Sequence, residues 1–119
     1  MQNYKDLNVW KKAHDLVLFL YKLTVDYPRV EQYTLTSQIR RAAIAIPANK
    51  SEGCGKFTQS DFANYLQVAL GSSNEVEYLT FLSCELGYLK PDSFKEVNVQ
   101  VNEVKAMLIA LIRKVRKDK

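Results

Sequence analysis

One apolar seam in the last quarter of the chain limits the folds that are open to it. Its members are separated by three and four residues in turn: Phe94, Val97, Val101, Val104, Leu108, Leu111 and Val115. That spacing puts all of them on one side of an α-helix, as in helices that pack lengthwise on other helices. The seam therefore predicts a long helix, from about residue 91 to 117, that needs helical partners.

Three earlier segments also have helical patterns, and they span residues 7–26, 36–54 and 59–86. The first ends before Tyr27-Pro28, because proline disfavours a helical residue before it. The third follows Thr58-Gln59-Ser60-Asp61, a capping box in the form that admits aspartate. Four Gly and three Pro are few for many tight turns. The sequence predicts one all-α domain, residues 1–119, folded as an antiparallel up-down-up-down four-helix bundle.

Residues with the chemistry of catalysis or metal binding are sparse. The chain has one histidine, His14, and two cysteines, Cys54 and Cys84. The cysteines fall near opposite ends of the predicted second and third helices, about 39 Å apart, which is too far for a disulfide or a shared metal. We predict free thiols, no catalytic residues, no metal and no cofactor, and so a protein that is not an enzyme. Lacking a secretory signal and a membrane-length apolar run, it is expected to be cytoplasmic.

Positive charge is concentrated at the end of the chain. The net charge is +4, and residues 113–119 alone hold five basic residues and one acidic residue. The rest of the chain therefore carries no net charge. Two interpretations remain open: the cations complement the negative end of the last helix, or they contact nucleic-acid phosphates.

A set of polar residues recurs on one side of the predicted second helix and faces acidic residues of the third. In an antiparallel hairpin of these helices, Arg40 and Arg41 fall beside Gly71, Ser72 and Glu75. We predict a structural polar network, with catalytic carboxylates as the alternative. Its members are Gln38, Arg41, Asn49, Glu52 and Glu75.

Apolar residues exceed what one bundle core requires. The surplus lies on the first and last predicted helices, at Leu18, Phe19, Tyr21, Met107, Ile109 and Ile112. An exposed stripe of this size is unusual on a soluble monomer. The sequence predicts a homo-oligomer whose interface comes from these two helices, or else an apolar surface for a protein partner.

The chain also resembles a known family over nearly its whole length. The matching motifs are Leu7-x-Val9-Trp10-x-x-Ala13, Gln38-Ile39-Arg40-Arg41-Ala42-Ala43-x-x-Ile46-Pro47-Ala48-Asn49-x-x-Glu52-Gly53, Phe62-x-x-Tyr65-Leu66-x-x-Ala69-x-Gly71-Ser72-x-x-Glu75-x-Glu77 and Leu86-Gly87-Tyr88-Leu89. They resemble the bacterial four-helix-bundle proteins encoded in intervening sequences of 23S ribosomal RNA genes. This chain departs from the family pattern at Ala45, where a serine is usual, and at Lys50-Ser51, where an apolar pair is usual.

The resemblance implies a four-helix bundle that forms a homo-oligomer. A related protein, the accessory variability determinant of diversity-generating retroelements, forms a pentamer and binds nucleic acid and a reverse transcriptase. No biochemical activity is implied for the family at large.

Charge and resemblance together predict a binding module for structured RNA or DNA. The predicted phosphate contacts are Arg40, Arg41, Lys50, Arg113, Lys114, Arg116 and Lys117. The alternative is a scaffold that binds a protein through its apolar face and has no role with nucleic acid.

Overall fold

The computed structural model describes residues 4–56 and 58–117, and within these ranges the chain forms helices and no strands. The elements are α1 (Tyr4–Thr24), the 3-10 helix η1 (Arg29–Glu31), α2 (Leu35–Cys54), α3 (Gln59–Glu85) and α4 (Pro91–Lys117). The predicted all-α four-helix bundle is confirmed. The helix ends differ from the predicted ones by at most three residues, with the largest difference at the start of α1.

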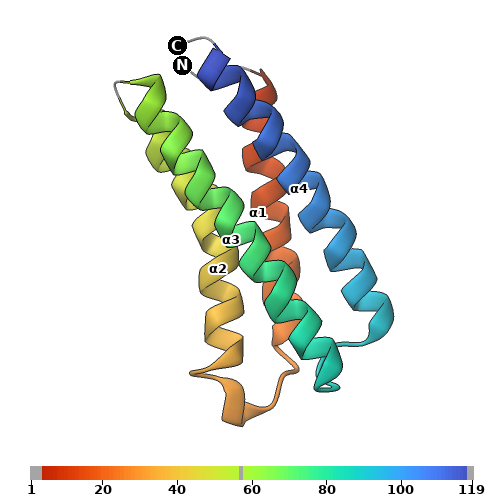
Figure 1. The fold of residues 1–119 in the computed structure, drawn as a ribbon. Coiled ribbons are helices and arrows are strands. Elements are labelled where there is room, and N and C mark those ends of the chain that lie inside the picture. The colour runs from red at the N-terminus through yellow and green to blue at the C-terminus, as the bar shows by residue number, and fades with distance from the viewer. Residues whose placement is uncertain (1–3, 57, 118–119) are drawn as a thin grey trace.

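The helices run alternately up and down an elongated bundle of 46 × 25 × 18 Å. Each helix packs on the next one along the chain, and α1 closes the bundle against α4. The start of α1, the α2–α3 turn and the end of α4 meet at one end (Figure 1). We call this the open-chain end, and the opposite end, with η1 and the α3–α4 loop, the connector end.

The apolar seam of α4 lies in the core, as the spacing predicts. Six of its seven residues are buried: Val97, Val101, Val104, Leu108, Leu111 and Val115. Phe94 is half-buried and contacts the ring of Phe81 on α3. The core side of α4 is wider than the seam, because Ile112 is also buried, with 4% of its surface exposed.

Small residues are buried on both helices of the α2–α3 hairpin. Ala42 and Ala43 are buried on α2, and Ala63 and Ala69 are buried on α3. Near the turn, a Cβ atom added to Gly53 would lie 2.8 Å from Cβ of Tyr65. Since real Cβ atoms do not approach this closely, glycine is required there for the two helices to meet.

Local signals at the ends of α3 also have the predicted roles. The hydroxyl of Thr58 accepts a hydrogen bond of 3.1 Å from the backbone N–H of Asp61, as an N-cap residue does. After α3, Gly87 has φ of +82°, which favours glycine over other residues. No disulfide joins Cys54 to Cys84, as their separation predicts.

Candidate nucleic-acid interface

The last turns of α4 present four cations to solvent. Arg113, Lys114, Arg116 and Lys117, which we call the α4 end cluster, are all exposed, and Val115 among them is buried. At about 100° per residue the four side chains span an arc of about 160° on the side opposite Val115. From Val104 to Lys117 the helix has no acidic residue. Burial of Val115 places one face of the helix in the core, and the four cations therefore lie on the opposite, exposed face.

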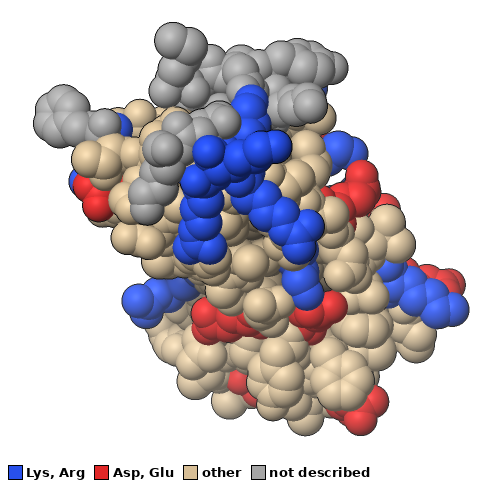
Figure 2. Space-filling model, turned by 45° about the horizontal axis from the view of Figure 1, so that its top comes forward, with Lys and Arg blue, Asp and Glu red and all other residues tan. Residues whose placement is uncertain are grey.

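The open-chain end gathers further positive charge around this cluster. Figure 2 shows lysine and arginine side chains gathered there, with acidic side chains on both sides of the group and below it. Lys56, in the α2–α3 turn, is exposed and stands 5.1 Å from the ring centre of Tyr65. Lys12 on α1 is partly neutralised by Glu103 of α4, at 3.1 Å. The uncompensated positive charge therefore belongs mainly to the end of α4.

Arg40 has a structural role that the sequence did not indicate. Its Nε donates to the hydroxyl of Thr24 over 2.9 Å, and Nη2 donates to the backbone oxygen of Tyr21 over 3.4 Å. The guanidinium also lies 4.4 Å from the centre of the Tyr21 ring. A cation at this place complements the negative end of α1. Arg40 therefore fastens α2 to α1, and it does not lie beside Gly71 as the hairpin register predicts.

The predicted polar network is only partly assembled. Gln38, Arg41 and Glu75 line a groove of about 410 Å³ between α2 and α3, but within the described ranges no hydrogen bond or ion pair joins Arg41 to Glu75. Asn49 donates to the oxygen of Ala45 in its own helix, at 2.7 Å. Glu52 is exposed. Arg41 thus lines the same groove as Ser72 and Glu75, as the predicted hairpin register requires. The expected ion pair between Arg41 and Glu75 is not formed.

The expectation that Lys50 contacts phosphate is wrong for this fold. Only 1% of its surface is exposed, and it is among the largest fully buried side chains. A lysine enclosed in this way cannot reach a nucleic acid without unfolding of the helix end. Arg41, in turn, lies about 20 Å from the end of α2. The predicted basic set therefore divides into the α4 end cluster, the separate Arg41, and two residues engaged inside the bundle.

A hydrogen-bonded pair at the connector end lay outside the sequence predictions. Glu31 of η1 accepts hydrogen bonds from the hydroxyls of Thr34 and Tyr88, the latter at 3.1 Å. The bond from Thr34, and next that from Tyr88, lower the pKa of Glu31, and the bond to Glu31 raises the pKa of Tyr88. The two residues are 57 positions apart, so no sequence pattern could have paired them.

Several exposed apolar side chains gather along α1 and in the turn just after it. Trp10, Leu18 and Tyr21 are exposed on one side of α1, and Val25 is exposed in the turn directly after it. His14 fills the gap in this stripe and stacks on Trp10 with ring centres 5.1 Å apart. We call these five residues the α1 stripe.

On α4, the apolar residues predicted to be in surplus are buried or half-buried. Ile112 belongs to the core, Met107 packs against it and Ile109 is half-buried. The expected contribution of α4 to an apolar interface stays a prediction. On α1, Phe19 likewise packs against the core.

The described part of the chain contains no group of three or more His, Cys, Asp or Glu residues that could hold a metal ion. None of its helices is both long and apolar enough to cross a membrane.

Comparison with known proteins places the chain in a family. The model of the family described as 23S rRNA-intervening sequence protein matches residues 5–110. A comparison with curated proteins gave no match. The predicted link to retroelement accessory proteins has no support from these comparisons and stays a prediction.

Among solved structures, the chain is similar to a protein of unknown function from the S23 ribosomal protein family of Bacteroides thetaiotaomicron VPI-5482. The two are 25% identical with a TM-score of 0.83, over 92% of this chain and 98% of the other. The family match covers most of the chain and the fold agrees along its length. This chain is a member of the 23S rRNA-intervening sequence protein family.

Proposed function

We propose that this protein is a non-enzymatic, oligomeric module that binds structured RNA or DNA through its phosphates. The observation that carries the proposal is the α4 end cluster: four exposed cations on one arc of a helix, with no acidic residue in the preceding two and a half turns. Such a group suits phosphates, which are spaced along a nucleic acid and are contacted mainly by Arg and Lys. Sequence preference would be weak, because nothing in the cluster is placed to read bases.

The support comes from this chain's own residues. The family match ends at residue 110, before the α4 end cluster begins. Arg41 adds a contact only for a nucleic acid that runs along the bundle from the open-chain end. Arg40 and Lys50 are left out of the proposal, since both are engaged within the bundle.

The test is an anisotropy titration with a structured RNA and with a duplex DNA at several salt concentrations. Lys114, Arg116 and Lys117 are changed together to Gln in one variant. In the matched control, Lys22, Lys90 and Lys95 are changed to Gln; they are exposed and lie toward the connector end. Both variants carry the same net charge, so any difference reports on position.

For the cluster variant we expect the slope of log affinity against log salt to fall by about 2 to 3, because each lost phosphate contact contributes about 0.9. The control should bind nearly as the wild type does. Equal losses in both variants would mean that net charge alone attracts the nucleic acid. Unchanged affinity and slope in the cluster variant would refute the proposal.

Self-association is the second part of the proposal, and the α1 stripe supports it. Beside the stripe, Trp10 and His14 line a groove of about 310 Å³ with Ile44 and Pro47 of α2. Apolar residues on one side of a helix are typical of helix-to-helix contacts. A second copy of the chain would cover this face and would bring several α4 end clusters together, which strengthens the local field.

The test of this part is molar mass in solution, measured by sedimentation. Leu18→Asp should dissociate the oligomer, because Leu18 lies in the stripe and is 56% exposed. Val99→Asp is the matched control, since Val99 is 62% exposed on α4 and lies outside the stripe. A wild-type protein that is strictly monomeric would remove self-association and favour the alternative function, a scaffold whose apolar face binds another protein.

A further inference from the structure

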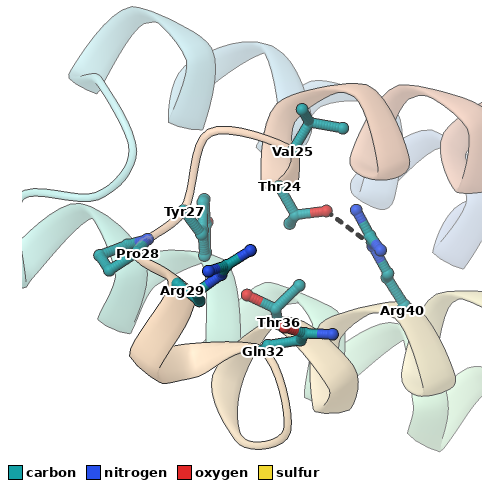
Figure 3. A pocket seen from close by; sticks show the side chains of 8 residues that line it. All are labelled: Thr24, Val25, Tyr27, Pro28, Arg29, Gln32, Thr36 and Arg40. Atoms are coloured by element: carbon teal, nitrogen blue, oxygen red, sulfur yellow. Dashed lines mark hydrogen bonds between the residues drawn. The ribbon is translucent and has the colours of Figure 1, made fainter.

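A second polar site lies at the connector end, where the chain passes from α1 through η1 into α2. It is a pocket of about 340 Å³. Figure 3 shows Arg29 of η1 and Arg40 and Thr36 of α2 extending into the space beyond the end of α1, with Tyr27 and Gln32 on its sides. None of the eight residues that line the pocket is acidic.

The hydroxyl of Thr36 is the unusual feature of this pocket. Thr36 is 7% exposed, and its oxygen is buried without a hydrogen-bond partner. The other buried hydroxyls of the described helices each donate to the carbonyl oxygen four residues earlier, as in the bonds of Thr24, Ser73, Thr80 and Ser83. Thr36 makes no such bond, because it is the second residue of α2 and the residue four positions earlier lies outside the helix. An unpaired buried hydroxyl is costly, so an acceptor that reached this oxygen after a small movement of the pocket wall would remove that cost.

Two arginines, Arg29 and Arg40, line the same pocket as that hydroxyl. The side chain of Arg29 makes no hydrogen bond or ion pair with another described residue, and only its backbone oxygen accepts a bond, from the N–H of Gln32. Arg40 uses Nε and Nη2 for Thr24 and Tyr21 and retains further N–H groups, since a guanidinium has five. The pocket also lies at the start of the 20-residue helix α2, where the helix dipole is positive. The first N–H group, that of Leu35, already donates to the Glu31 carboxylate over 3.4 Å.

We propose that this pocket binds a phosphate monoester carried by a small molecule of about mononucleotide size. A monoester has three acceptor oxygens and a charge of about −1.5 to −2 near neutral pH, which matches two guanidinium groups, a hydroxyl and a helix start. A carboxylate, with one charge and two oxygens, would leave donors unused. The volume lies within the range of about 300 to 1,000 Å³ that is usual for ligand pockets, so the rest of the molecule would rest against Tyr27, Pro28 and Val25.

This site is separate from the α4 end cluster, which lies at the other end of the bundle. The two proposals can therefore fail independently. A free phosphorylated metabolite and the 5′-phosphate end of an RNA offer the same chemistry, and the experiment distinguishes them.

The test is calorimetric titration of the full chain with adenosine 5′-monophosphate, inorganic phosphate, adenosine and acetate. Arg29→Gln and Thr36→Val are the pocket variants; Arg29 is exposed, and valine keeps the shape of threonine. Arg41→Gln is the matched control, an exposed arginine of α2 outside the pocket. Thermal melts of each variant without ligand establish that it is folded.

We expect saturable binding of the monophosphate, weaker binding of inorganic phosphate, and none of adenosine or acetate. Each pocket variant should lose at least about tenfold in affinity, the effect of one charge-assisted hydrogen bond, and Arg41→Gln should lose none. A short RNA with a 5′-phosphate, compared with the same RNA ending in a hydroxyl, is titrated into the variant lacking Lys114, Arg116 and Lys117. A gain from its phosphate that vanishes in Arg29→Gln would assign the site to RNA ends.

Three results would overturn the proposal. One is the absence of binding by any phosphate compound at millimolar concentration. Another is equal binding of adenosine and its monophosphate. The third is binding that survives Arg29→Gln and Thr36→Val but is lost with the α4 end cluster, because the phosphate would then occupy the other end of the bundle.

Discussion

The close approach of α2 to α3 at Gly53 gives a prediction whose size follows from the structure. A Cβ atom at position 53 would lie 2.8 Å from Cβ of Tyr65 and 2.9 Å from Cδ1 of Phe62. The Cβ atom of Tyr65 is fixed by the backbone, so rotation of the side chain does not relieve the contact. Gly53→Ala must therefore push the two helices apart near their turn, an overpacking that costs about 1 to 3 kcal/mol.

Gly71 of the same hairpin supplies the matched control. It lies inside α3, and a Cβ atom added there would have no neighbour within 4 Å. Gly71→Ala should stabilise the protein by about 1 kcal/mol, because alanine favours a helix more than glycine does. The same gain in helix propensity applies to Gly53→Ala, but it is smaller there because Gly53 lies in the last turn of α2. Gly53→Ala should thus be less stable than Gly71→Ala by about 1 to 3 kcal/mol.

The assay is urea unfolding at one fixed protein concentration, followed by far-UV circular dichroism. Fixing the concentration matters because self-association would add to the apparent free energy of unfolding. Equal midpoints for the two variants, with unchanged urea dependence, would show that α2 and α3 are farther apart in solution, and the argument from Gly53 would fail.

Three further predictions concern the connector end. Thr36→Val should raise the free energy of unfolding of the ligand-free protein by about 1 kcal/mol in urea titrations, because it removes a buried hydroxyl without a partner; a loss of stability would mean that the hydroxyl is paired in solution. Arg40→Ala should cost about 1 to 3 kcal/mol through the lost bonds to α1, and Arg40→Lys should recover less than half of it, since lysine lacks the planar fork; full recovery would argue against this geometry. The third prediction concerns pH. The hydrogen bond from Thr34, and next that from Tyr88, lowers the pKa of Glu31 below its ordinary 4.5. These bonds therefore stabilise the folded protein above pH 4.5, and that stabilisation is lost as the pH falls through the lowered pKa. The difference in unfolding free energy between wild type and Tyr88→Phe should therefore narrow between neutral pH and about pH 3, and a constant difference would contradict the bond to Glu31.

The helices and their order were predictable because their signals are local. The seam of α4 repeats at the period of the helix, and six of its seven residues are in the core. The cap at Thr58 and the stop after α3 act within a few residues of chain. The exposure of the α4 end cluster also follows locally, since Val115 lies on the opposite side of the helix.

Which side chains meet across helices was decided only by the tertiary structure. Lys50 is enclosed and Ile112 is in the core, although nothing near either residue in the sequence distinguishes it from its exposed neighbours. Arg40 binds Thr24, 16 positions away, and Thr36 has a buried hydroxyl without a partner. Periodicity fixes which residues share a side of one helix. The rotation and offset of that helix against its neighbours depend on how all four pack together, and these determine which polar groups are buried, paired or left open to a ligand.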